Sequence, residues 1–193
     1  ALLYAAPQTS GALYSGVRIA EVAVVGGRRG IWLSAANTQI GASLFSKQFS
    51  DSVFLPAVTG DTEIQGNDFQ QDATGGKAIV FESQYASPPS AGRIDISDNT
   101  LYGKANFIVW NSWVGSAAPK SVELNVDHNT VVKTKGPAVA LIPPAASTVG
   151  FGQFSRITIA NTIVERAGGD AVYVDYTYSP ANPDTPDNGQ IQI

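Results

Sequence analysis

The sequence LNVDHNTV at residues 124–131 follows the same pattern as IDISDNTL at residues 94–101. Each segment reads apolar, polar, apolar, then a short polar step, an asparagine, one further residue and an apolar residue. Alternating apolar and polar residues predict a β-strand with one buried face. TEIQGNDF at 62–69 repeats the pattern, and ITIANTI at 157–163 repeats it with one residue fewer. The chain is therefore built from a repeated unit that begins with a strand.

A second apolar run follows each of these segments and predicts the second strand of the unit. Weaker copies of the unit occupy residues 17–33 and 38–55, and GQIQI at 189–193 begins another. Later units are longer because insertions rich in Pro, Ala, Ser and Gly, which are typical of loops, follow the second strand. The four apolar runs are AIVF (78–81), FIVW (107–110), AVAL (138–141) and AVYV (171–174).

Strands that recur at this spacing, without a helical period between them, predict a coil of parallel strands in which each turn stacks on the last. We therefore expect an all-β fold. It would be a right-handed parallel β-helix solenoid of about six to seven turns, with loop insertions after the second strand of each turn. In this interpretation residues 1–16 form a lead-in segment, and residues 17–193 form the repeats, which end in the middle of a turn.

The alignment also predicts which residues share a position on successive turns. Two columns of inward-facing residues form the expected core. Aligned asparagines form a stack at the turn after the first strand, where amides that pair with one another can stay buried. The core columns are Ile64, Ile96, Val126 and Ile159, and then Ile79, Ile108, Val139 and Val172. The asparagine stack is Asn67, Asn99, Asn129 and Asn161.

These units resemble those of the right-handed parallel β-helix proteins of the pectin-lyase-like superfamily, over residues 17–193. That superfamily includes polysaccharide lyases, glycoside hydrolases, epimerases, phage tailspikes and structural or adhesive surface proteins, so the resemblance implies a fold and leaves the activity open. The chain lacks the Gly-His-Gly and Arg-Ile-Lys segments of polygalacturonases, the Asp-Pro-His-Glu of alginate epimerases and the Trp-Ile-Asp-His of pectate lyases. Tailspike hydrolases share no short motif and stay in consideration.

Composition argues against several classes of partner and cofactor. The net charge is −4 and the 12 lysines and arginines are scattered along the sequence, so we expect no nucleic-acid partner. No apolar run is long enough to span a bilayer. With no cysteine and one histidine, the chain cannot supply thiolates or two imidazoles to a metal. Glu82 and Asp175 belong to different predicted turns and do not converge on a cation, so we expect no metal and no other cofactor.

His128 is a candidate for chemistry because the alignment places it one turn from Asp98. Neighbouring strands lie about 4.8 Å apart, and a carboxylate at that distance can orient an imidazole that acts as a general base. Asp127 precedes His128 and joins the same candidate group. In the alternative interpretation, which we favour, the Ser-Asp-Asn and Asp-His-Asn steps are polar corners held by local bonds to the backbone.

A second candidate is the pair Glu63 and Asp95, which the alignment places on neighbouring turns in an outward-facing column. Retaining glycosidases need two carboxyl groups about 5 to 5.5 Å apart, and inverting ones need about 6.5 to 9.5 Å. The predicted spacing suits either class. A solvated sheet face would carry the same residues without any catalytic role.

The insertions hold aromatic residues on successive turns, and these residues could line one flank of the solenoid. They would stack on sugar rings or on an apolar patch of a partner protein, or else pack on their own loops. The candidate ligand-binding residues are Tyr85, Trp113, Phe151, Tyr176 and Tyr178.

Both predicted ends lack a cap, which leaves strand edges open. We therefore expect the chain to join the rest of a longer chain, or copies of itself arranged head to tail or as a trimer. Our leading hypothesis is a non-catalytic structural or adhesive module at the cell surface, on a virion or elsewhere outside the cell. It would form a rigid rod or fibre whose loop flank binds glycans.

The alternative hypothesis is a polysaccharide-degrading enzyme, a glycoside hydrolase or lyase similar to a tailspike. It would act through outward carboxylates, with the imidazole assisting. The candidate catalytic residues are Glu63, Asp95, Asp98, Asp127 and His128.

Overall fold

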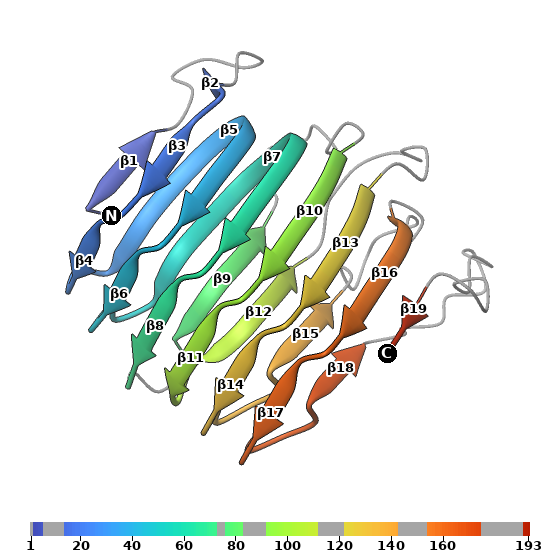
Figure 1. Cartoon of the computed structure of the whole chain (residues 1–193). Coiled ribbons are helices and arrows are strands. Elements are labelled where there is room, and N and C mark those ends of the chain that lie inside the picture. Colours follow the sequence, from blue (N-terminus) through green and yellow to red (C-terminus); the bar gives the residue numbers. More distant parts are fainter. Residues whose placement is uncertain are drawn as a thin grey trace.

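The computed structural model describes residues 2–5, 14–72, 76–82, 92–111, 122–142, 154–174 and 191–193. The regular elements in these ranges are all β-strands, and neighbouring strands pair in parallel. The strands stack side by side into a solenoid that advances from the N-terminal to the C-terminal end (Figure 1). The expected all-β parallel solenoid is confirmed. The described chain contains no helix, and thus none that could span a membrane.

Each turn contributes three strands, whereas we expected two. β10 (Gly92–Ser97), β11 (Thr100–Gly103) and β12 (Asn106–Asn111) form one such turn. The middle strand directly follows the asparagine and is too short for an alternating pattern to mark it as separate from the first strand. The apolar run is the third strand, so the insertions follow the third strand and not the second, as residues 112–121 follow β12.

The three strands of successive turns form three columns. The first column contains β3 (Arg18–Ala20), the C-terminal part of β5 (Arg29–Gly41), the C-terminal part of β7 (Asp51–Gln65), β10, β13 (Val122–Asp127), β16 (Phe154–Ala160) and β19 (Ile191–Gln192). The second contains β4 (Ala23–Val25), β6 (Leu44–Ser46), β8 (Asp68–Gln71), β11, β14 (Thr130–Val132) and β17 (Ile163–Glu165). The third contains the N-terminal parts of β5 and β7, then β9 (Lys77–Glu82), β12, β15 (Val139–Ile142) and β18 (Val172–Val174).

Strand pairing already begins within residues 1–16, which we expected to be a lead-in segment. β1 (Leu3–Ala5) and β2 (Tyr14–Ser15) both pair with β5. The strands described in this stretch have three and two residues, which is too short for an alternating pattern that aligns with the later units.

The two predicted core columns are confirmed. Ile96 pairs in register with Ile64 and Val126, and Val126 pairs with Ile159. These side chains are buried, and the second predicted column is paired in the same way. Val172 is only partly buried because it lies in the last described turn. Burying one such aliphatic side chain contributes about 1.5–3 kcal/mol, so the inward columns supply the main stabilising term.

A column of buried asparagines holds the corner between the first and second strands. Asn67, Asn99 and Asn129 are 2, 1 and 1% exposed. The Oδ1 atom of Asn99 accepts from the backbone N–H of Asn67 at 3.0 Å and from its side-chain amide at 3.0 Å. Asn129 accepts from Asn99 in the same way, at 3.0 and 3.1 Å. Asn99 Nδ2 also donates to the carbonyl of Ile64 at 2.8 Å. Each of these side chains therefore forms hydrogen bonds with polar groups at the corner of the preceding turn.

Asn161 lies outside this column, contrary to our expectation. The strand register places it level with His128, one position earlier, with a φ of 46° and an exposed side chain. Thr162 takes the column position, and its Oγ1 donates to the carbonyl of Ala160 at 2.9 Å. The unit ITIANTI has one residue fewer before its asparagine, which moves the asparagine out of the buried position.

We expect Asn99→Ala to lower the free energy of unfolding by about 2–4 kcal/mol, because the buried backbone N–H of Asn67 loses its acceptor and Ile64 loses a donor. Asn161→Ala is the matched control and should change the unfolding free energy by less than about 0.5 kcal/mol. Urea unfolding of both variants measures the difference. Equal effects would contradict the assignment of the column.

Candidate functional site

The residue before each corner asparagine has a left-handed backbone. Gly66, Asp98 and His128 have φ values of 67, 55 and 52°. Glycine adopts this conformation without strain, and Asp and His tolerate it better than most residues. The side chains of Asp98 and His128 are exposed at the outside of the corner. The Ser-Asp-Asn and Asp-His-Asn steps are therefore corners of the backbone.

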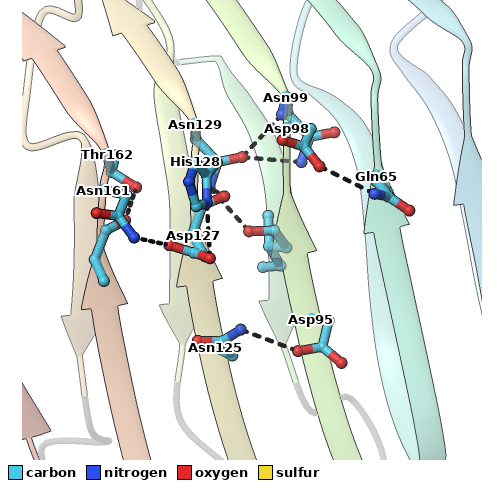
Figure 2. Close-up of polar contacts among 12 residues, drawn as sticks. Gln65, Asp95, Asp98, Asn99, Asn125, Asp127, His128, Asn129, Asn161 and Thr162 are labelled. Atoms are coloured by element: carbon cyan, nitrogen blue, oxygen red, sulfur yellow. Dashed lines mark hydrogen bonds and ion pairs between the residues drawn. The ribbon is translucent and has the colours of Figure 1, made fainter.

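The His128 imidazole interacts with its sequence neighbour and not with the next turn (Figure 2). Its Nδ1 atom lies 2.8 Å from Oδ2 of Asp127, and its side chain is 61% exposed. Asp98 instead accepts from Nε2 of Gln65 at 3.0 Å. Both residues lie in the described chain, and no hydrogen bond or ion pair joins them. The alignment thus placed Asp98 and His128 on neighbouring turns correctly, but their side chains point to other partners.

Asp127 is held by two donors. Besides His128, the Nδ2 atom of Asn161 donates to Oδ1 of Asp127 at 2.9 Å. The Asn161 amide is the larger cause, and the His128 imidazole the second, of a pKa of Asp127 that lies below the usual aspartate range. The carboxylate is therefore ionised at neutral pH and suits hydrogen-bond acceptance better than proton donation.

Glu63 and Asp95 are cross-strand neighbours on the outer face of the first column, as the alignment predicted. Asp95 forms an ion pair with Nε of Arg93 at 2.8 Å and accepts from Nδ2 of Asn125 at 3.2 Å. Glu63 accepts from Nε2 of Gln39 at 3.2 Å. Each carboxylate thus has its own donors, and no hydrogen bond or ion pair in the described chain joins the two side chains. The register allows a carboxylate pair, while the contacts are those of a solvated polar face.

Two shallow hollows lie on this outer face and share Gln39 and Glu63 in their linings. The larger, of about 510 Å³, is bordered by Asp61, Arg93 and Asp95. The hollows bring the predicted catalytic pair to the border of a depression that a small polar group could enter.

The smaller hollow, of about 350 Å³, reaches the corner that carries Asp98. Small residues line it, among them Gly41 and Gly66, and charged side chains of Arg18 and Glu21 also border it. Asp127 and His128 are not part of either lining. The five catalytic candidates therefore do not meet at one depression: Glu63, Asp95 and Asp98 border hollows, and the Asp127–His128 pair lies beyond them.

The five aromatic candidates for ligand binding, Tyr85, Trp113, Phe151, Tyr176 and Tyr178, lie outside the described residues. Asp175 does as well, so the separation of Glu82 and Asp175 stays a prediction. Within the described ranges, no group of three or more His, Cys, Asp or Glu side chains could hold a metal ion.

The sequence interpretation missed a buried ion pair. Nε of Arg29 lies 2.7 Å from Oδ2 of the buried Asp51, on the partner strand. The Arg29 guanidinium also lies over the rings of Phe54 and Trp32, at 3.8 and 4.9 Å from their centroids. Only the register of β5 and β7 brings these residues together, and no local pattern indicates it. The ion pair occupies Oδ2 of Asp51, while its buried Oδ1 has no hydrogen-bond partner in the described chain.

Comparisons of the chain with protein-family models, with curated proteins and with solved structures found no match. The function must therefore be inferred from the residues and their geometry.

Asn161→Ala should raise the pKa of Asp127, because it removes the larger of the two donors that stabilise the carboxylate. NMR titration of the Asp127 side chain measures the change. The folded-state pKa is the depressed one, so this group stabilises the fold above its unfolded pKa, and the contribution is lost as pH falls through the folded pKa. An unchanged pKa would show that the Asn161 contact is absent in solution.

Proposed function

We propose that the chain is a structural module, a rigid rod that forms part of a larger assembly and joins its neighbours through its two ends. The rod is stiff because neighbouring turns share both sheets, and the middle turns also share the asparagine column. The single observation that supports this role best is the distribution of exposed apolar side chains. Eight of the ten large apolar residues exposed in the described chain lie in the terminal turns. They are Leu2, Leu3, Tyr4, Tyr14 and Val25 at one end and Ile163, Tyr173 and Ile193 at the other.

The strand edges at both ends support the same proposal. Within the described ranges, β3 and β4 at one end and β17, β18 and β19 at the other each pair on one side only. An unpaired edge offers backbone donors and acceptors to another strand. All strands run in the same direction within their columns, so a head-to-tail arrangement continues parallel pairing. The neighbour at each end is a second copy of this chain or further turns of a longer one.

The setting that we propose is the outside of a cell or virion, where rods of the pectin-lyase-like superfamily that the repeats resemble include structural and adhesive proteins. The absence of cysteine and the low charge content suit an exported rod. The aromatic residues of the insertions would supply its glycan-binding flank, because aromatic faces combine a large apolar area with a polar edge.

We expect the purified chain to assemble with rising concentration. The double variant Tyr4→Lys with Ile163→Lys should weaken this association at least about tenfold, because it places charges in both apolar end faces. Phe49→Lys is the matched control, since Phe49 is 78% exposed but lies on the second turn. Sedimentation velocity measures the masses. A strictly monomeric wild-type chain without affinity for a glycan array would contradict the proposal.

A polysaccharide-degrading enzyme is the second candidate, and the observation that favours it is the neighbouring position of Glu63 and Asp95 beside the hollows. If this pair is catalytic, Glu63→Gln and Asp95→Asn should each reduce depolymerisation of a capsular or acidic glycan by a factor of at least about 100. Asp68→Asn is the control, since Asp68 lies outside both hollows and is not one of the catalytic candidates. Measurement of released reducing ends with a glycan panel decides the question. Activity that survives both substitutions would remove Glu63 and Asp95 from consideration.

A further inference from the structure

Basic side chains gather on one edge of the solenoid, although they are scattered in the sequence. The edge is the corner between the second and third strands, where β4, β6, β8, β11, β14 and β17 end (Figure 1). Six exposed cations lie there, half of the 12 lysines and arginines of the chain. We name this set the basic ridge: Arg28, Lys47, Lys104, Lys133, Lys135 and Arg166.

Backbone bonds between turns align the ridge along the solenoid axis. The N–H of Lys135 donates to the carbonyl of Lys104 at 3.1 Å, and the N–H of Lys133 donates to that of Glu165 at 2.9 Å. Neighbouring turns are about 4.8 Å apart, so the cations form a row with the period of the strands or a multiple of it.

Most of this charge is not neutralised by carboxylates within the described chain. Arg166 forms an ion pair with Glu165 at 3.0 Å. The Nζ atom of Lys133 donates to the hydroxyl of Tyr102 and lies 4.7 Å from the centroid of its ring, which leaves the positive charge in place. Lys47, Lys104 and Lys135 have no ion pair among the described residues. The ridge therefore presents cations that a partner with negative charge would satisfy.

Acidic side chains lie on the other side of the short second strand. They occupy the corner between the first and second strands and the outer face of the first column. We name this set the acidic patch: Glu21, Glu63, Asp98 and Asp127. Glu21, Glu63 and Asp98 border the smaller hollow, where Arg18 is the cation in the lining. Small residues of the lining leave room for an incoming side chain.

The two surfaces match in period as well as in charge. Both follow the spacing of the strands over their C-terminal parts. The patch takes Glu63, Asp98 and Asp127 from three successive turns, and the ridge takes Lys104, Lys133 and Arg166 from three. On the turn of β8 the ridge is interrupted by the exposed Asp72, which is level with Lys104. A second copy with a parallel axis therefore brings several cations level with several carboxylates at once. Single exposed ion pairs are weak, but a row of pairs fixed on two rigid bodies acts together. A duplex nucleic acid would need a wider footprint of cations than this single row.

We propose that the basic ridge of one copy docks side by side against the acidic patch of a second copy. The contact joins two different surfaces, so it is heterologous and builds either a closed ring or an open row of rods. This lateral contact rests on the proposed role as a rod in an assembly and adds a second contact to the one at the ends.

The test is a charge swap followed by sedimentation velocity. The ridge variant combines Lys104→Glu, Lys133→Glu and Lys135→Glu, and the patch variant combines Glu63→Lys with Asp98→Lys. Lysine already occupies left-handed positions at Lys47 and Lys133, so it can replace Asp98 at the same φ. To remove stacking at the ends, all proteins carry Tyr4→Lys and Ile163→Lys, and circular dichroism verifies that they are folded.

On this background, the chain with native ridge and patch should associate at about 0.02 M salt and dissociate at about 1 M, where the Debye length is about 3 Å. Each charge variant alone should bind itself at least about tenfold more weakly. An equimolar mixture of the two should form heterodimers, and one chain with all five reversals should associate with itself again. Arg156→Glu, outside the ridge, should have no effect.

A background chain that stays monomeric at low salt, or a mixture without heterodimers, would overturn the proposal. If the ridge variant instead loses binding to a sulfated or uronate polysaccharide while self-association is unaffected, the ridge serves a polyanion and the proposal is also wrong. Failure of this lateral contact leaves the proposed end-to-end contact intact, because the end substitutions test that contact separately in the chain without charge changes.

Discussion

At four corners between the first and second strands, those of Val22, Ser43, Asn67 and Asn99, a backbone N–H leaves both sheets and must find an acceptor inside the solenoid. The next turn supplies it. The N–H of Ser43 donates to Oδ1 of Asn67 at 3.2 Å, and the N–H groups of Asn67 and Asn99 donate to the following asparagines in the same way. At the N-terminal side, Ser43 Oγ takes the same role for Val22 at 3.3 Å. Because an unpaired buried N–H is costly, each of these four turns depends on the polar side chain of the turn after it.

This constraint also determines what the candidate site can do. The residue before each column position must adopt a left-handed backbone, which turns its side chain outward. Asp98 and His128 are therefore exposed on the same edge, one turn apart, and each finds a nearer partner, Gln65 for Asp98 and Asp127 for His128. A corner built in this way presents the polar side chains of Asp98, His128 and Asn161 to solvent in a row over three successive turns. Such a row suits recognition by a second surface better than it suits acid–base chemistry, which needs convergence on one point.

The sequence predicted those features that recur in every unit. The inward columns and the asparagines at 67, 99 and 129 could be aligned because their neighbours repeat as well. The short second strand could not be recognised, since three or four residues do not show a period. The alignment assigned Asn161 to the asparagine column wrongly, because its unit has one residue fewer before the asparagine. A shift of one residue changes which side chains pair. Arg29 and Asp51 lie 22 residues apart, and the cations of the basic ridge come from several turns, so only the stacking of turns brings them together.

Hydrogen exchange at the corner amides tests most directly whether the asparagine column holds the turns together. The backbone N–H groups of Asn67 and Asn99 point away from the sheet ladders, so their protection comes from the side-chain acceptors of the following turn. We predict that they exchange as slowly as the central strands, at the rate set by global unfolding. Exchange as fast as that of exposed turns would show that the column does not form in solution and would contradict this account.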